Sequence, residues 1–283
     1  MRAAALVFLL LASAADFGAK NGEEISNKQT VLAEIDKALG AGPPSLEYIF
    51  VRPLPHWKVF GDAGSGRNPY GHAVVRYTLP DRTQKVMNIV GDPKREMVHF
   101  VSPAEYLYGT GIFDTASEQG GVYNRGMVSV RVEKLPPEAL LALDRYYAEL
   151  QARSRSGDAR FSLVLSWLKN LFKGKPEWGN CSGWVSKGLV SAGILDRPTY
   201  WPKELWVRLY EKYRGLDPAN VHVVCYRRVR HAVQTYGTRA QMHGLVAPLR
   251  WHKSARWWDL EKLGDVIVEV PEGSRAAVVR RGR

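Results

Sequence analysis

The sequence contains few cysteines, because only Cys181 and Cys225 occur among its 283 residues. Two cysteines are too few for a disulfide-rich scaffold or for a four-cysteine zinc site. Long apolar runs are missing as well: none approaches the roughly 20 residues that span a bilayer, which excludes a multi-span membrane protein. We find no internal repeat and no low-complexity tract, which excludes a repeat array.

What the chain does contain is an ordinary globular composition, with 45% hydrophobic and 24% charged residues. This length fits one large domain with additions, or two small domains. The formal net charge is +12, and twelve basic against five acidic side chains lie between His222 and Arg283. A positive field attracts anions such as nucleic acid, phospholipid headgroups or an acidic protein. A solvated basic surface is the simpler explanation of this charge.

Tryptophans lie among the basic residues near the C-terminus, at Trp251, Trp257 and Trp258. Such a cluster suits a membrane interface, and it could equally stack on nucleic-acid bases. No recognised nucleic-acid motif accompanies it, so we predict no specific nucleic-acid partner. An anionic membrane surface stays a candidate partner.

The first residues resemble a targeting segment. A basic start at Arg2 is followed by a short apolar stretch that ends in small residues before Asp16. This pattern is typical of a secretory signal peptide, and we predict one at residues 1–15, followed by an N-terminal arm at residues 16–45. The alternative is a buried helix of the mature fold. A signal peptide would place the protein in the secretory pathway or outside the cell; an intracellular location is the other option.

Hydrophobic periodicity and turn residues predict an α+β fold with a largely antiparallel sheet. Strands are expected at residues 46–52, 71–78, 83–90, 98–101, 127–132, 221–226, 266–270 and 276–279. Helices are expected at residues 136–153, 161–172 and 181–193, and from Pro202 onward. In the helix at residues 136–153, the side chains expected to face the core are Leu140, Leu141, Leu143, Tyr147 and Leu150. Glycine-rich loops at residues 61–71 and 106–126 would shape a binding pocket.

The most informative segment is the expected helix at residues 181–193, which would be capped by Asn180 and would begin at Cys181. A helix N-terminus carries partial positive charge and unpaired N–H groups, which stabilise a thiolate and could hold an oxyanion. A nucleophile in this position needs a neighbouring base and a group that orients the base. Taken alone, however, a single cysteine is more often an inert core residue.

His72 is the best candidate for the base, because it begins an expected strand directly after a glycine-rich loop. A three-residue turn in the following hairpin would place Asn88 opposite His72, where its side-chain oxygen could accept from the ring. Other turn lengths would shift this pairing, and His99 is the substitute for the orienting position. Cys225 alternates within a valine-rich strand and is interpreted as a core residue.

The order of these motifs resembles a known superfamily. Gly71-His72, a polar residue one strand later, and then Asn180-Cys181-Ser182-Gly183-Trp184-Val185 are similar to the circularly permuted papain-like superfamily, in which the histidine strand precedes the cysteine helix. NlpC-type peptidases of this branch, lecithin–retinol acyltransferase-like proteins and PPPDE-type isopeptidases share that order. The resemblance covers residues 46–215 and implies a permuted papain-like fold, with an antiparallel sheet packed against the helix that bears the nucleophile. Residues 216–283 have no counterpart and form a basic, tryptophan-rich extension with α/β character.

By this resemblance, Cys181 matches the nucleophile, His72 the base and either Asn88 or His99 the orienting residue. Members of the superfamily cleave amide, isopeptide or ester bonds, or transfer acyl groups between lipids. We therefore expect a cysteine hydrolase or acyltransferase that forms an acyl-enzyme on a peptide, isopeptide or lipid acyl substrate. No cofactor, nucleotide or metal is implied.

Two other functions fit the same sequence. A papain-like scaffold without catalytic activity could bind anionic lipid or another polyanion through its basic C-terminal region. A structural protein of an oxidising compartment could instead join Cys181 to Cys225 in a disulfide. The sequence leaves the oligomeric state open.

Overall fold

The computed structural model describes residues 44–51, 71–91, 96–101, 103, 106, 127–162, 170, 176–228, 260, 262–270 and 278–281. The expected signal peptide at residues 1–15, nearly all of the arm at residues 16–45 and the tryptophan cluster lie outside these residues. The same holds for most of the helix expected at residues 161–172 and for most of the two glycine-rich loops.

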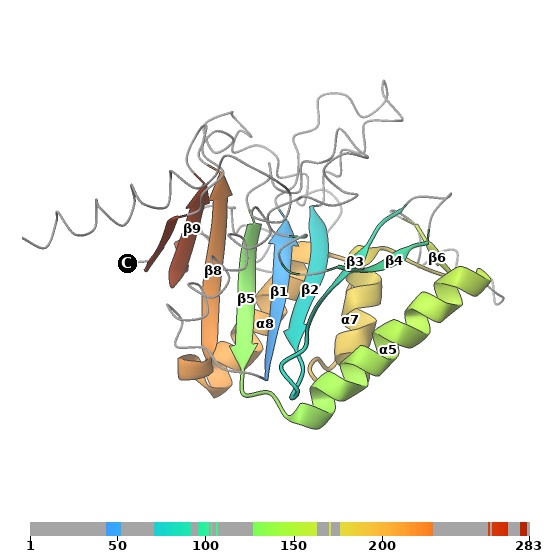
Figure 1. The fold of residues 1–283 in the computed structure, drawn as a ribbon, viewed down its shortest axis with the longest axis horizontal. Helices are drawn as coiled ribbons and strands as arrows, with labels where there is room; N and C mark the ends of the chain where they lie inside the picture. Colours follow the sequence, from blue (N-terminus) through green and yellow to red (C-terminus); the bar gives the residue numbers. More distant parts are fainter. Residues whose placement is uncertain are drawn as a thin grey trace, which may run out of the picture.

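The dominant element is an eight-stranded sheet with the order β10-β9-β8-β5-β1-β2-β3-β4 (Figure 1). Neighbouring strands are antiparallel except for the parallel pair β8–β9. Two short strands, β6 (Ala159–Phe161) and β7 (Glu177–Gly179), form a separate parallel pair. The strands of the large sheet are β1 (Ser45–Val51), β2 (His72–Thr78), β3 (Gln84–Ile89), β4 (Val98–Val101), β5 (Met127–Glu133), β8 (Val221–Arg228), β9 (Val266–Val270) and β10 (Val278–Arg281).

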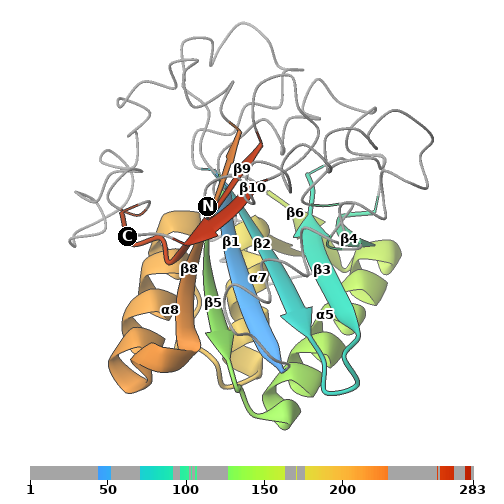
Figure 2. The same cartoon turned by 60° about the vertical axis from the view of Figure 1, so that its left-hand side comes forward.

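Among the described residues, three helices cover one face of this sheet (Figure 2). They are α5 (Pro137–Ser156), α7 (Cys181–Ser191) and α8 (Pro202–Leu216), and a short 3₁₀ turn, η2 (Pro218–Asn220), follows α8. The fold is therefore mixed α+β with a mostly antiparallel sheet, as the sequence predicts. In the part of the chain that the structure describes, no helix has the length and apolar character that a membrane crossing requires.

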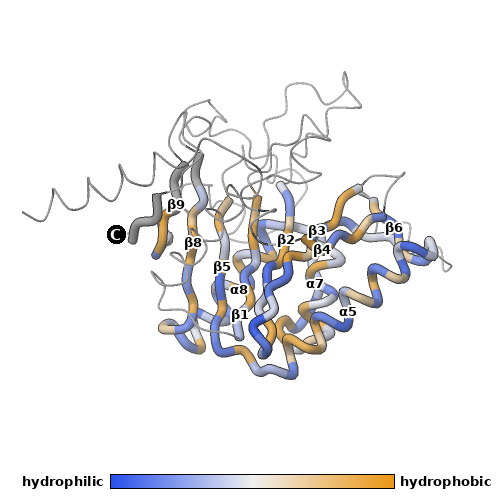
Figure 3. The backbone as a smooth tube through the Cα atoms, viewed as in Figure 1, coloured by the Kyte–Doolittle hydropathy of each residue, from blue (hydrophilic) through white to orange (hydrophobic). Residues whose placement is uncertain are grey.

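Alternate residues of each strand point to opposite faces of the sheet. The face away from the helices mixes buried polar side chains such as Glu47 with buried apolar ones such as Ile49 and Val74. The face toward the helices carries the hydrophobic core, which the side chains of α5, α7 and α8 complete. Core residues from the strands include Leu46, Tyr48, Phe50, Ala73, Val75, Tyr77, Met87, Ile89, Val128, Val130, Val132 and Val223. Hydrophobic and hydrophilic residues also alternate along α5, which turns one stripe toward this core (Figure 3).

Helix α5 begins at Pro137, where the sequence predicts it, and buries four of its five expected core residues. Leu141 is the exception, because 49% of its surface is exposed. The buried residues Leu140, Leu143, Tyr147 and Leu150 follow the 3.6-residue helical period, and Leu141 lies to one side of this stripe. The prediction for Leu141 was therefore wrong.

Helices α5 and α7 approach each other closely at Gly188. A Cβ atom at this position would lie 2.5 Å from Cε1 of Tyr147 and 2.9 Å from Cδ1 of Tyr146. Tyr147 is fixed in place, because its hydroxyl donates to the Val185 carbonyl at 3.0 Å. Only glycine therefore fits at residue 188 without displacing a buried ring.

This contact leads to a prediction about stability. Gly188→Ala should lower the free energy of unfolding by about 1–3 kcal/mol, because the added methyl group overpacks the core. Gly215→Ala is the matched control in α8, since a Cβ atom there meets nothing within 4 Å. Denaturant titration of both variants tests this, and equal stabilities of the two variants would contradict the close packing at residue 188.

Candidate active site

The candidate nucleophile begins helix α7, as the sequence predicts. Asn180 precedes the helix in an extended conformation, and its Oδ1 atom accepts from the Gly183 N–H at 2.7 Å. An asparagine cap of this kind satisfies one of the free N–H groups of the first turn. The backbone N–H groups of Cys181 and Ser182 lie close enough to the Cys181 sulfur to lower the pKa of the thiol.

The sulfur of Cys181 is buried in the core, with only 2% of the residue exposed. Burial raises the pKa of the thiol to about 11, against the lowering effect of hydrogen bonds from the Ala73, Ser182 and Cys181 backbone N–H groups. The helix amides favour the thiolate form of Cys181, as expected from the sequence. The loss of solvation on burial has the larger effect, however, and it keeps the thiol protonated at neutral pH.

His72 and Asn88 form a hydrogen-bonded pair, with 2.6 Å between Nε2 of the ring and Oδ1 of the amide. Because an amide oxygen can only accept, the proton of this bond belongs to Nε2, and Nδ1 is left with a lone pair. Gly71, which precedes the histidine, has a φ of +79°, and a Cβ atom there would lie 2.5 Å from the Val51 carbonyl oxygen. Residue 71, which directly precedes the first residue of β2, must therefore be glycine.

The expected register of this hairpin was wrong by two residues. Asn88 pairs with Val74 rather than with His72. The cause is a longer turn: Leu79 N donates to Thr83 O and Arg82 N donates to Leu79 O, so five residues connect the strands. A shift by two residues leaves both side chains on the same face of the sheet, which explains why the pair still forms.

His99, the substitute for the orienting position, lies on β4 directly opposite Asn88. The hydrogen bond to the His72 ring at 2.6 Å comes from Asn88.

Cys181 and His72 lie at the same end of β2, but they approach it from different faces of the sheet. Ala73, Val75 and Tyr77 point toward α7, so His72 begins the strand on the face that also carries Asn88. The Cys181 sulfur accepts from the Ala73 N–H, and this nitrogen is two covalent bonds from the His72 Cα atom. The β2–β3 ladder ends at the Val74–Asn88 pair, just before this point.

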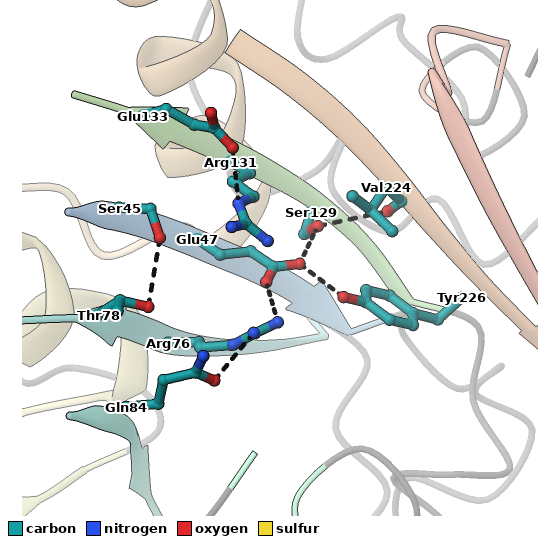
Figure 4. Close-up of polar contacts among 10 residues, drawn as sticks. All are labelled: Ser45, Glu47, Arg76, Thr78, Gln84, Ser129, Arg131, Glu133, Val224 and Tyr226. Atoms are coloured by element: carbon teal, nitrogen blue, oxygen red, sulfur yellow. Dashed lines mark hydrogen bonds and ion pairs between the residues drawn. The ribbon is translucent and has the colours of Figure 1, made fainter. Parts of the chain in front are cut away.

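A second polar cluster, which the sequence analysis missed, lies on the sheet face away from the helices (Figure 4). Glu47 is its centre: one carboxylate oxygen accepts from Ser129 Oγ at 2.6 Å and from Tyr226 Oη at 2.7 Å. The other oxygen accepts from Arg76 Nη1 at 3.2 Å. Four strands thus meet at one buried carboxylate. The sequence signal for this cluster was the alternation of charged and apolar residues along the strands. The same alternation is typical of a strand with one solvent-exposed face, so it did not indicate a buried cluster.

Both cysteines are free thiols in the structure, and Cys225 is a fully buried core residue of β8, as predicted. The structure therefore gives no support to a Cys181–Cys225 disulfide. The described residues contain no group of three or more His, Cys, Asp or Glu side chains that is arranged to hold a metal ion.

Comparison with known proteins adds no relative: no family model, no curated protein and no solved structure matches this chain. The interpretation of the site therefore depends on its own geometry and on the order of its motifs.

Proposed function

We propose that the protein is a cysteine hydrolase or acyltransferase of permuted papain-like type, acting on amide or ester bonds through Cys181, His72 and Asn88. The observation that carries this proposal is the His72–Asn88 hydrogen bond of 2.6 Å at the end of β2. The helix that begins with Cys181 contacts the backbone of the next residue, Ala73. A thiol at a helix N-terminus, a base and an orienting amide form the constellation that nucleophilic catalysis needs.

In the proposed reaction, Nδ1 of His72 takes the proton of the Cys181 thiol across the end of β2 while the sulfur attacks the substrate carbonyl carbon. The carbonyl oxygen becomes an oxyanion, which N–H groups of the first helical turn can stabilise. The bond from carbon to the leaving nitrogen or oxygen then breaks, and the leaving group takes the proton from His72. A thioester on Cys181 remains, and water or a second acceptor releases the acyl group with His72 as the base.

The thiol of Cys181 is protonated before the reaction, and this state determines how the proton is transferred. Because burial raises the pKa of Cys181 to about 11, a preformed thiolate is scarce at neutral pH. Proton transfer to His72 therefore accompanies the attack. Asn88 supports the transfer, because its oxygen holds the ring tautomer that carries the proton on Nε2 and the basic lone pair on Nδ1.

The experiment is acylation by p-nitrophenyl acetate, which transfers an acetyl group to the sulfur and releases p-nitrophenol. We expect one acetyl group per chain, located on Cys181 by peptide mass spectrometry, and a rate that falls at least about 100-fold in His72→Ala. Cys181→Ala should abolish the labelling, whereas Cys225→Ala, which changes the other buried cysteine, should retain it. Acylation that is independent of His72 would contradict the proposal.

The competing function is a papain-like scaffold that binds an anionic surface without catalysis. Two observations favour it: the burial of the Cys181 sulfur and the basic excess after residue 221. Its signature would be binding to phosphatidylserine-containing vesicles that weakens steeply with salt and persists in Cys181→Ala. That result, together with unlabelled Cys181 in the wild type, would replace the enzymatic proposal.

A further inference from the structure

A short segment that ends at the first residue of α8, residues 199–202 and here called the strap, packs against the N-terminal half of the nucleophile helix. Ser186 in α7 binds the strap twice: its hydroxyl donates to the Thr199 carbonyl at 2.9 Å and accepts from the Thr199 N–H at 3.0 Å. Asn180 adds a third bond, because Nδ2 donates to the Tyr200 carbonyl at 2.9 Å. The ring of Tyr200 also packs against Gly183, where a Cβ atom would come within 2.9 Å of it.

The strap is also bound to the sheet. Tyr48 projects from β1 toward the helices, and its hydroxyl donates to the Pro202 carbonyl at 2.8 Å. The Tyr48 side chain is completely buried, so its orientation is fixed by its surroundings. Burial and the charge that Cys181 would carry both raise the pKa of Tyr48, which places the phenol and the thiol within electrostatic reach of each other.

Two carbonyl groups of the strap, at Tyr200 and Pro202, therefore accept hydrogen bonds from two different elements. Asn180 belongs to the helix of the nucleophile, and Tyr48 belongs to the strand next to β2, which bears His72. The distance between nucleophile and base depends on how α7 sits on the sheet, and these two hydrogen bonds connect α7 and the sheet through a common third element.

We propose that Tyr48 and Asn180 are positioning residues, which set the separation of Cys181 and His72 because their hydrogen bonds to the strap connect α7 to the sheet. This inference rests on the proposed function of Cys181 and His72. Neither residue takes part in proton transfer. A displacement of about 1 Å between reacting groups can cost as much as 100-fold in rate, so a connection of this kind affects turnover beyond its contribution to stability.

The chain supplies a matched control for this test. Tyr77 lies on the neighbouring strand β2, also faces the helices, is equally buried and also makes one hydroxyl hydrogen bond, to Asp144 Oδ1 at 2.7 Å. Its partner lies on α5 rather than on the strap. Tyr48→Phe and Tyr77→Phe each remove one oxygen from a buried ring, and each should lower the denaturation midpoint, Tyr77→Phe at least as much because its acceptor is a carboxylate.

Acylation by p-nitrophenyl acetate separates the two roles. We expect Tyr48→Phe to lower the maximal acylation rate at least about 10-fold, with the half-saturating ester concentration unchanged, and Tyr77→Phe to change neither. Asn180→Ser keeps a capping oxygen for Gly183 but loses the hydrogen bond to Tyr200. Its maximal acylation rate should therefore fall as well. Because both bonds act through the strap, the Tyr48→Phe/Asn180→Ser double variant should lose less than the product of the two single effects.

The outcomes distinguish the two proposals. If Cys181→Ala and His72→Ala acylate like the wild type, the proposed function is wrong. If these two variants are inactive but Tyr48→Phe matches Tyr77→Phe in maximal rate, only the positioning role is overturned. If Tyr48→Phe fails to fold, Asn180→Ser provides the test instead. An unchanged maximal acylation rate in Asn180→Ser also overturns the positioning role.

Discussion

Glu47→Ala should lower the free energy of unfolding by about 3–5 kcal/mol, as measured by denaturant titration. The carboxylate is buried, with 3% of its side chain exposed, and it is paired with an Arg76 side chain that is equally buried. Removing it leaves the guanidinium of Arg76 in the protein interior without its counter-charge. The hydroxyls of Ser129 and Tyr226 lose their shared acceptor at the same time.

Asp196→Ala provides the comparison, since Asp196 pairs with Lys212 at 2.8 Å but is 85% exposed. An exposed ion pair contributes at most about 1 kcal/mol, so this variant should stay close to the wild type. The cost at residue 47 comes from an uncompensated charge, and Glu47→Leu combined with Arg76→Met should therefore recover part of the loss. If Glu47→Ala costs no more than Asp196→Ala, the buried cluster does not stabilise the sheet.

The second large effect concerns pH. Folding raises the pKa of Cys181 from the ordinary value of 9.0 to about 11, because burial disfavours the thiolate. Between these two values the folded protein keeps a proton that the unfolded chain releases, so stability falls as the pH rises. The contribution is complete well below pH 9, and it is lost as the pH rises through about 11, with a total loss of about 3 kcal/mol at 1.36 kcal/mol per pKa unit.

Many other groups titrate in this range, so the measurement compares the wild type with Cys181→Ala at each pH. The difference between their free energies of unfolding should be constant below pH 9 and should decrease steadily above it. The difference between the wild type and Cys181→Ser, which keeps a small polar atom at the position, should decrease in the same way. A difference that stays constant over the whole range would mean that the thiol is not desolvated by folding.

The local elements of this fold were predictable where single residues determine them. Asn180 marks the start of α7, and Pro137 marks the start of α5, because a capping oxygen and a fixed φ act within one helical turn. The β2–β3 hairpin was predictable from its turn residues, although its register was not. The conformation of Arg82, with a φ of 70°, extends the turn, and no sequence rule demands that conformation at an arginine.

The features of the site that could not be predicted from the sequence depend on contacts between segments that are distant in the chain. The N–H of Ala73 that binds the Cys181 sulfur is a backbone group, which every residue except proline has. The burial of Cys181, which reverses the expected ionisation of its thiol, follows from how α7 sits on the sheet. The Glu47 cluster likewise needs four strands in register before its members meet, and pattern alone assigns its charges to solvent.

The order of the strands has a consequence for how the protein matures during synthesis. Strand β1 leaves the ribosome first among the described strands, yet it lies between β2 and β5 in the finished sheet. Its second edge stays open until β5 has been made, and the helix that bears Cys181 emerges later still. A nascent chain that has completed the His72–Asn88 hairpin but not yet α7 therefore lacks the proposed nucleophile. Contacts this distant in sequence also slow folding, so we expect the site to be among the last parts of the molecule to assemble.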